Sequence, residues 1–303
     1  MTIEASGTPM ESDCWLDDDG RILKSSSVVM GMPMTMFVVD EATALQDFLP
    51  AEIFEVNMVP VGEHIPTDAQ EVVYRVTVEN PQAAETGLPE TDYQKVRRAS
   101  ENQFLVTVTR ADHANLKDSA DGAGPGEEYF EANLILDSED EAVSSLLTQA
   151  IPPQSKTSVR QADALRVFVT NYIEDKNLNI GFATASEVAR QPQGDCTEHA
   201  VLLAALGRAA GIPTRVAAGL VYLPTWLDAK GELRRNVMGY HMWTQFYLDG
   251  RWVDFDAAQN QSECSPTRLT MMTSSLRDSS ISELGLEMLD LMGQIHIEVI
   301  SIK

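Results

Sequence analysis

A helix with a marked start and a marked end is the feature that most restricts how this chain can fold. Asp195 is a residue type that caps helices, and Glu198 follows three residues later, which gives a capping-box pattern. Gly211 and Pro213 match the residues that commonly end helices. The pattern therefore predicts a helix between these signals, with Cys196 as its first residue.

Residues 241–258 predict a β-hairpin whose register is set by its turn. The Asp-Gly pair at 249–250 is typical of a two-residue type I′ turn, so Leu248 pairs with Arg251. Successive side chains of a strand point to opposite faces, so this register predicts one shared face of polar and aromatic residues. That face holds His241, Trp243, Gln245, Tyr247, Trp252, Asp254 and Asp256.

The two halves of the chain differ in their residue patterns. Runs of β-branched and aromatic residues in the first half predict strands near residues 15–25, 53–61, 71–80, 103–110 and 133–137. In the second half, helices are predicted at 138–151 and 161–176, and a loop is expected at 224–240. We therefore expect an α+β protein. A β-rich, sandwich-like N-terminal domain at 1–138, accessory or binding a substrate or partner, precedes a C-terminal domain at 139–303.

The charge of the chain excludes some classes of partner. The formal net charge is −24 over 303 residues. So acidic a surface repels phosphate backbones and anionic lipids, which argues against nucleic acid as a partner. No apolar run reaches the roughly 18 residues that a membrane-spanning helix needs. The oligomeric state is left open by the sequence.

The sequence contains no signature of a bound cofactor. Its three cysteines, Cys14, Cys196 and Cys264, are too few and too scattered for a disulfide framework, although a single Cys14–Cys264 bridge stays open. No pair has CxxC spacing, which excludes a structural zinc site of that kind. A row of methionines at period two (Met30, Met32, Met34 and Met36) suits a soft metal, but it is more often core filler. We therefore expect no metal and no other cofactor.

Cys196 has a position that suits a nucleophile. The helix dipole favours a thiolate at the first helical position, although the neighbouring Asp195 acts against it. A nucleophilic thiol also needs a base, and the base needs a third group that orients it. His199 lies on the same helix and cannot easily face the thiol across a cleft. His241 opens the hairpin and is a diagonal neighbour of Asp256, about 7–8 Å away between backbones.

Three blocks of sequence carry a resemblance to a known family. They are Cys196 in GDCTEHAVLLAALGRAAGIPTRVAAGLVY, His241 in HMW and Asp256 in RWVDFDAAQ. In this combination the chain resembles the transglutaminase-like superfamily of bacterial proteins over residues 139–303. That family has a papain-like Cys-His-Asp triad. The resemblance implies a papain/transglutaminase-like C-terminal domain, with helices packed on an antiparallel sheet.

The resemblance also implies a reaction. Cys196 would attack an amide or peptide carbonyl and form a thioester, with His241 as base and then acid, and with Asp256 holding the imidazole tautomer. The backbone N–H of Cys196 and an upstream donor, Gln193 or Gln191, would stabilise the oxyanion.

Two tryptophans and two departures from the family pattern bear on the substrate. Trp243 and Trp252 are candidates for the walls of a substrate cleft, although cross-strand packing is the favoured alternative. Met242 stands where the family usually has a small residue, and Ala257 stands where proline commonly follows the aspartate. Neither departure removes a catalytic group, so they affect the expected substrate preference more than the chemistry.

Several functions and locations remain open at this stage. The leading hypothesis is an amide or peptide-bond hydrolase, or an acyltransferase, that acts on a protein or peptide. The alternatives are a catalytically silent scaffold that binds proteins and a calcium-dependent crosslinking transglutaminase. Related bacterial proteins are often exported, which favours a periplasmic or extracellular location. The first 20 residues lack the pattern of an export signal, so a cytoplasmic location is the alternative.

Overall fold

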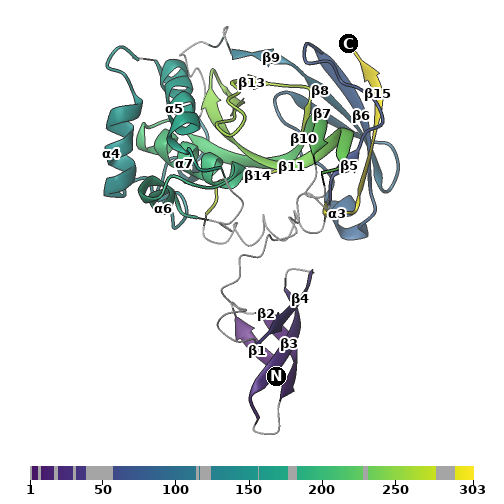
Figure 1. The fold of residues 1–303 in the computed structure, drawn as a ribbon. Helices are drawn as coiled ribbons and strands as arrows, with labels where there is room; N and C mark the ends of the chain where they lie inside the picture. Colours follow the sequence, from purple (N-terminus) through teal and green to yellow (C-terminus); the bar gives the residue numbers. More distant parts are fainter. Residues whose placement is uncertain are drawn as a thin grey trace.

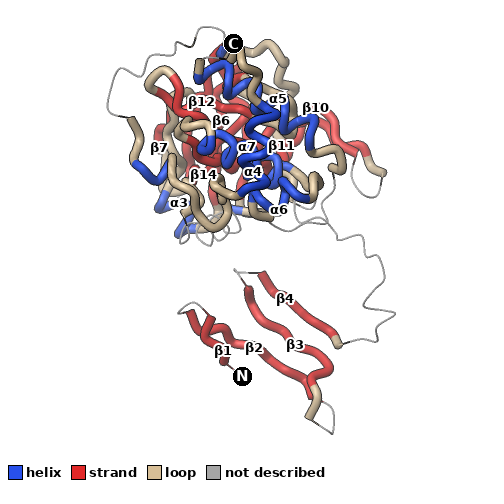
Figure 2. The backbone as a smooth tube through the Cα atoms, turned by 90° about the vertical axis from the view of Figure 1, so that its left-hand side faces the viewer, coloured by secondary structure: helices blue, strands red, loops and turns tan. Residues whose placement is uncertain are grey.

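The computed structural model shows the α+β fold that the sequence predicts, and all of its named strand pairs are antiparallel. Figures 1 and 2 show the arrangement of helices and strands. The described residues are 2–5, 8–16, 20–29, 32–38, 57–113, 116, 124–155, 157–176, 183–227, 231–277 and 291–303.

The first four strands form an antiparallel sheet of their own (Figure 2). They follow one another in sequence order as β1 (Thr2–Ala5), β2 (Thr8–Leu16), β3 (Ile22–Val29) and β4 (Met32–Phe37). The strand-forming region predicted near 15–25 falls on the end of β2 and the start of β3, which pair with each other. Met32, Met34 and Met36 lie on β4 at the predicted period of two, whereas Met30 lies outside the described residues.

The central sheet contains the predicted hairpin and has the strand order β12-β11-β10-β14. Its strands are β10 (Thr214–Leu227), β11 (Leu233–Leu248), β12 (Arg251–Phe255) and β14 (Arg268–Ser274), and the short β5 (Val59–Pro60) also pairs with β11. Leu248 pairs with Arg251, which confirms the predicted register. Asp249 and Gly250 have φ values of 52° and 75°, as a type I′ turn requires.

Another four-stranded sheet joins the C-terminal strand to strands from the first half of the chain. Its order is β15-β6-β8-β7, from β6 (Glu71–Val78), β7 (Gln94–Arg98), β8 (Gln103–Thr109) and β15 (Ile295–Ile302). Burial alternates along β6, so one face of this sheet is turned inward. The pairing of β15 with β6 crosses the division expected at residue 138, and one buried apolar cluster also extends across it. That division stays a prediction.

The named helices other than α3 gather on one side of the central sheet (Figure 1). They are α4 (Glu141–Ala150), α5 (Ser158–Tyr172), α6 (Ala185–Arg190) and α7 (Cys196–Ala209). Helix α7 lies between the other three helices and strands β10 and β11, and every residue from Thr197 to Arg208 is buried. It begins at Cys196 and is followed by Gly211 at φ 75°, so both predicted ends are confirmed.

Two segments differ from the prediction. Residues 133–137 form a turn rather than a strand, because the side chain of Asn133 accepts the backbone N–H groups of Ile135 and Leu136. The expected loop at 224–240 belongs mostly to the long β10–β11 hairpin, which continues to Leu227 and resumes at Leu233. The end of an exposed hairpin is as rich in polar residues as a loop, which explains why residues 224–240 are predicted to be a loop.

The remaining named elements are short. They are the helix α3 (Pro81–Thr86), the 3-10 turn η2 (Glu127–Tyr129) and the paired strands β9 (Ala111–Asp112) and β13 (Glu263–Cys264). Cys14, Cys196 and Cys264 are all free thiols in the structure. Within the described ranges, the helices are too short or too polar to cross a lipid bilayer.

Candidate active site

Cys196 is held at the start of α7 by a complete capping box. The Asp195 carboxylate accepts the N–H of Thr197 at 2.7 Å, and the Glu198 carboxylate accepts the N–H of Asp195 at 3.0 Å. The N–H of Cys196 has no acceptor among the described residues, as expected for the first turn of a helix. The cysteine is half-buried. Its sulfur and its backbone N–H therefore occupy the end of a rigid, buried helix.

Gly194 explains how the chain enters this helix. Its φ of +137° is a conformation that side chains disfavour, and a Cβ there would lie 2.4 Å from Cγ of Glu198. Both the backbone angle and the space therefore require glycine. The dipeptide Gly194-Asp195 before the cysteine is the local signal of this tight entry.

Glu198 is a buried carboxyl group that links two segments. It is fully buried and also accepts the N–H of Ala183 at 3.2 Å, which ties the residues before α6 to the entrance of α7. Burial and, secondly, the neighbouring Asp195 carboxylate raise the pKa of Glu198 to about 7. The support of the Cys196 loop therefore contains a group that titrates near neutral pH.

The structure brings His241 and Asp256 into direct contact. His241 Nε2 lies 2.7 Å from Oδ2 of Asp256, and the Cys196 thiol lies within hydrogen-bond reach of the same imidazole. Because Asp256 occupies Nε2, Nδ1 is the ring nitrogen that remains for the thiol. The His241 imidazole thus lies next to both the Cys196 thiol and the Asp256 carboxylate.

Asp256 reaches His241 from a loop rather than from the ladder of the hairpin. Strand β12 ends at Phe255, and Asp256 instead exchanges two backbone hydrogen bonds with Gln261, each 2.8 Å. Helix α5 braces this loop, since Thr170 donates to the carbonyl of Ala257 at 2.8 Å. The predicted ladder pairing therefore ends three residues early, but the predicted His–Asp contact forms.

The electrostatics of the pair favour opposite charges. Burial alone lowers the pKa of His241, but Asp256 and Cys196 outweigh it and raise the pKa to about 10. Burial also acts to raise the pKa of Asp256, yet the cations of His241 and Arg268 hold it well below its usual range. At neutral pH the site therefore holds an imidazolium against a carboxylate.

Arg268 is a member of this group that the sequence reasoning missed. Its side chain is 3% exposed, and its Nη2 donates to Asp256 Oδ2 at 2.9 Å. Its guanidinium carbon also lies 5.4 Å from the centre of the Trp243 ring. An arginine on a strand carries no local signal of this role, because β14 comes near Asp256 only in the folded sheet.

The two predicted cleft tryptophans have different surroundings. Trp243 is only 1% exposed, its ring stacks beside His241 at 6.2 Å, and its Nε1 donates to Asp254 at 2.9 Å. It is therefore a buried packing residue. Trp252 pairs with Tyr247 near the hairpin turn, six residues along β11 from His241, or roughly 20 Å at strand spacing. The structure does not bring Trp252 to Cys196.

Gln193 and Gln191 both lie just before the cysteine loop. Gln193 forms a bridge with Asp175, and Gly194 donates to the carbonyl of Asp175 at 3.0 Å. The side chains of the two glutamines are 3.4 Å apart, with Gln191 exposed and Gln193 half-buried. Both stay candidates for the second oxyanion donor.

The His199 ring is bonded to the start of its own helix, α7, and does not serve as a second base for the Cys196 thiol. Its Nδ1 lies 2.6 Å from the carbonyl of Asp195, its own helical i−4 neighbour. Burial lowers the pKa of His199, so the ring is neutral and Nδ1 donates. His199 therefore braces the same turn that holds Cys196.

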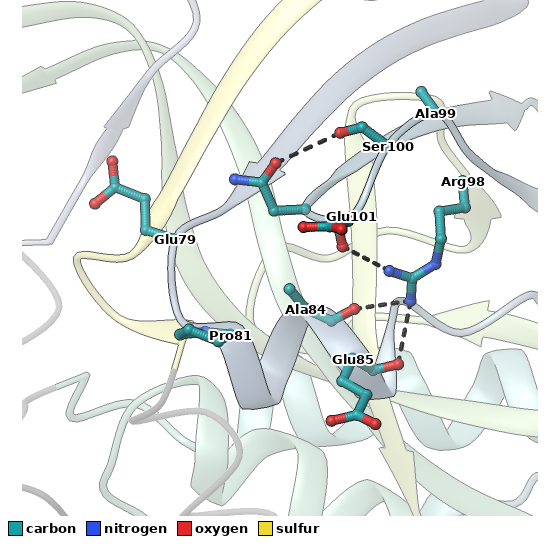
Figure 3. Close-up of a pocket in the computed structure, with 9 residues that line it drawn as sticks. Glu79, Pro81, Ala84, Glu85, Arg98, Ala99, Ser100 and Glu101 are labelled. Carbon is teal, nitrogen blue, oxygen red and sulfur yellow. Dashed lines mark hydrogen bonds between the residues drawn. The ribbon is translucent and has the colours of Figure 1, made fainter.

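One open pocket lies away from these residues. It has a volume of about 870 Å³ and lies between α3 and the β7–β8 turn (Figure 3). Arg98 spans it and donates to the carbonyls of Ala84, Glu85 and Glu101. The guanidinium of Arg98 is therefore already hydrogen-bonded to backbone carbonyls. Among the described residues, no group of three or more His, Cys, Asp or Glu side chains is placed to hold a metal ion.

Comparison with known proteins identifies one family. Residues 146–257 match the sequence profile of the Transglutaminase-like superfamily. Those residues include Cys196, His241 and Asp256. Among curated proteins, none is significantly similar to this chain.

Several solved structures are similar at low identity. A candidate cysteine protease from Cytophaga hutchinsonii shares 13% identity and a TM-score of 0.49, over 76% of this chain and 86% of that chain. The periplasmic domain of TgpA from Pseudomonas aeruginosa shares 15% identity and a TM-score of 0.39, over 67% and 83% of the two chains. Red sea bream transglutaminase shares 12% identity and a TM-score of 0.35, over 68% and 49%. These values are too low for an activity to be carried over.

Proposed function

Through residues 146–257 the chain belongs to the transglutaminase-like superfamily, and on that premise we propose that it is a cysteine-dependent hydrolase or acyltransferase. It cleaves amide or peptide bonds of a protein or peptide substrate through a thioester on Cys196. The observation that supports this proposal is the line of contacts from the Cys196 thiol through His241 to Asp256. A charged pair buried beside a cysteine at the start of a helix favours an enzyme over a silent scaffold.

The acylation step follows from the charges of the site. With the thiol proton already on His241, the sulfur of Cys196 attacks the carbonyl carbon, so that a C–S bond forms. The oxyanion is stabilised by the free N–H of Cys196 and by a donor from Gln193 or Gln191. As the C–N bond breaks, the imidazolium gives its proton to the leaving amine. Asp256 stabilises the imidazolium and keeps its Nε2–H fixed.

The second step decides between hydrolysis and acyl transfer. A water or an amine attacks the thioester carbon, His241 accepts its proton, and the C–S bond breaks to release the sulfur of Cys196. We favour water, because bacterial members of the superfamily are more often proteases or amidases, which is an argument from analogy. The crosslinking alternative uses the same thioester with a lysine amine as acceptor.

The first test is the pH dependence of Cys196 alkylation by iodoacetamide, with each cysteine followed by mass spectrometry. In the wild type we expect a rate at pH 6 that is already near its plateau, because the thiol proton resides on His241. In His241→Ala we expect the alkylation rate of Cys196 to be low at pH 6 and to rise as the pH is increased. The matched control is His113→Ala, which removes the histidine beside Cys264 instead.

Two outcomes of this test are informative. Loss of the pH 6 reactivity in His241→Ala, but not in His113→Ala, supports a reactive pair at Cys196. Identical profiles in wild type and His241→Ala would contradict the proposal and favour the silent scaffold that binds proteins.

A second experiment separates the two fates of the thioester. Protein and peptide substrates are incubated with and without a primary amine such as methylamine, and the product masses are measured. Hydrolysis gives acid products that do not change when amine is added, whereas transamidation gives the methylamide. A calcium titration in the same assay tests the calcium-dependent alternative, for which activity must rise with calcium.

A further inference from the structure

Arg268 and His241 share one oxygen of Asp256. Oδ2 lies 2.7 Å from His241 Nε2 and 2.9 Å from Arg268 Nη2, whereas Oδ1 accepts the N–H of Gln259 at 2.9 Å. The carboxylate is 1% exposed and the guanidinium 3% exposed, so solvent screens neither group. The buried carboxylate therefore divides its negative charge between two cations.

The fold contains a specific device that brings Arg268 to this place. Gly219 pairs with His241 on β11, and a bulge in the β10–β14 pairing falls between Ala218 and Gly219. A Cβ on Gly219 would lie 2.0 Å from the carbonyl oxygen of Leu269, so only glycine permits this approach of β14. Val221 pairs with Arg268, and Val221 and Gly219 lie two residues apart on β10. Arg268 therefore shares the sheet face of His241.

Asp256 is the only carboxylate within hydrogen-bond reach of Arg268 among the described residues. Nη2 also donates to the side-chain oxygens of Gln261 at 2.6 Å and Gln259 at 3.3 Å. Nε and Nη1 have no hydrogen-bond partner among the described residues. Besides Cys196, charged or titratable groups near this centre are Asp254 on β12, Cys264 on β13, His199 on α7 and Lys176, which donates to the carbonyl of Ala258.

We propose that Arg268 is a positioning residue, which keeps Asp256 ionised and limits how strongly this carboxylate holds the imidazolium proton of His241. The inference rests on the proposed function, because Arg268 aids the reaction at the stage when the thioester is broken down. At that stage the thiolate is gone, and His241 must be neutral to accept a proton from water or an amine. An unshared, buried carboxylate would hold the proton more tightly and slow that step.

The sign of the effect follows from charge alone. Removal of a cation next to Asp256 raises the pH at which Asp256 and His241 each lose a proton, because both protonated states then meet less positive charge. A unit charge in direct contact shifts a carboxyl group by about 1–3 pH units, and we expect about 1 unit at the more distant His241. A replacement that keeps the charge leaves both midpoints in place.

The test is the titration of the His241 ring by NMR, in wild type, Arg268→Met and Arg268→Lys. We expect the midpoint to rise by about 1 pH unit in Arg268→Met and to move by less than about 0.3 unit in Arg268→Lys. Arg208→Met is the matched control. Arg208, in the last turn of α7, is about equally buried but donates to the backbone carbonyls of Glu131, Thr214 and Ser275. Its loss lowers stability without moving the His241 midpoint.

The outcomes separate this inference from the proposed function. An unchanged His241 midpoint in Arg268→Met would show that Arg268 only fills space, even if Cys196 is reactive. A shifted His241 midpoint together with an unreactive Cys196 would support the electrostatic role of Arg268 and contradict the proposed enzymatic function. If Arg268→Met does not fold, Arg268→Gln removes the charge but keeps hydrogen bonding, and the same midpoint decides.

A kinetic consequence can be measured once a substrate is known. In Arg268→Met we expect the alkaline shift of His241 to slow thioester breakdown about tenfold at neutral pH, because each pH unit lowers the neutral fraction tenfold. The loss should disappear as the pH is raised. A loss of equal size at every pH would instead point to a structural defect.

Discussion

Two groups of cysteine, histidine and aspartate lie in this protein, and only one has the surroundings of a nucleophile. In the first, Cys196 begins a helix and touches His241, which is bonded to Asp256. In the second, Cys264 is 2% exposed and lies 4.0 Å from His113. Its sulfur accepts the backbone N–H of Asp254 at 3.4 Å.

The two groups differ in whether nearby charges offset the effect of burial on the pKa values of their residues. Burial, and secondly the nearby Asp254 carboxylate, raise the pKa of Cys264, so its thiol stays protonated. The Asp254 carboxyl also has a raised pKa because of burial, whereas the cations around Asp256 reverse the effect of burial there. Residue types alone therefore do not make a triad. We expect the arrangement of compensating charge to decide which cysteine is reactive.

The largest expected effect compares the two cysteines directly. We expect Cys196→Ser to lower kcat for amide hydrolysis by about 10⁴- to 10⁶-fold, as for loss of other catalytic nucleophiles. Cys264→Ser should stay within about threefold of the wild type, since it removes no group that meets the substrate. Steady-state kinetics on one substrate checks both. Equal losses in the two variants would break the comparison.

The two aspartates give the next largest contrast. Asp256→Asn leaves the buried Arg268 and His241 without a carboxylate, and we expect a loss of about 3–5 kcal/mol in the free energy of unfolding. Asp254 accepts Trp243 Nε1–H and a Gln245 side-chain N–H on one oxygen, which an asparagine oxygen can replace. We therefore expect Asp254→Asn to cost less than about 1.5 kcal/mol. Urea unfolding at pH 7 measures both.

Glu198, which supports the loop before Cys196, predicts a pH dependence of the free energy of unfolding. Its folded pKa of about 7 lies above the unfolded value of about 4.3, so the native state binds more protons between these limits. Stability from this group is therefore full below about pH 4.3 and declines as the pH rises to about 7. Unfolding free energies between pH 4 and 8 should decline less in Glu198→Gln than in the wild type. Parallel curves would exclude this linkage.

The smallest expected effect is that of a substitution at Gly194, which tests the role of the loop before Cys196. Gly194→Ala places a side chain at φ +137° and against Glu198, and we expect a loss of about 1–3 kcal/mol in the free energy of unfolding. The displaced loop should also slow Cys196 alkylation, with no change at Cys264. The matched control is Gly62→Ala, where φ is also positive but a Cβ meets no atom within 4 Å.

Several features of the site could be predicted because they depend on neighbours in sequence. The capping residues Asp195 and Glu198 act within one turn, so the start of α7 at Cys196 follows from the local pattern. The Asp-Gly turn sets the register of β11 and β12, so the chain that follows Phe255 returns to the neighbourhood of His241. These predictions needed no knowledge of distant contacts.

Other features needed the folded chain. Trp252 looked equivalent to Trp243, but the distance along β11 separates it from the cysteine. The pairing of β15 with β6 joins residues more than 200 positions apart, and no local pattern indicates such a partner.

By itself, the sequence determined the α+β class, the helix that presents Cys196 and the hairpin that carries His241, since all of these are decided by residues a few positions apart. Only the tertiary structure decided which charges surround the triad. Arg268 reaches Asp256 because a bulge at Gly219 lets β14 approach, and Glu198 is buried because α7 is enclosed by other elements. Burial and contact between distant strands set the protonation of such groups, and neither is encoded in a local pattern.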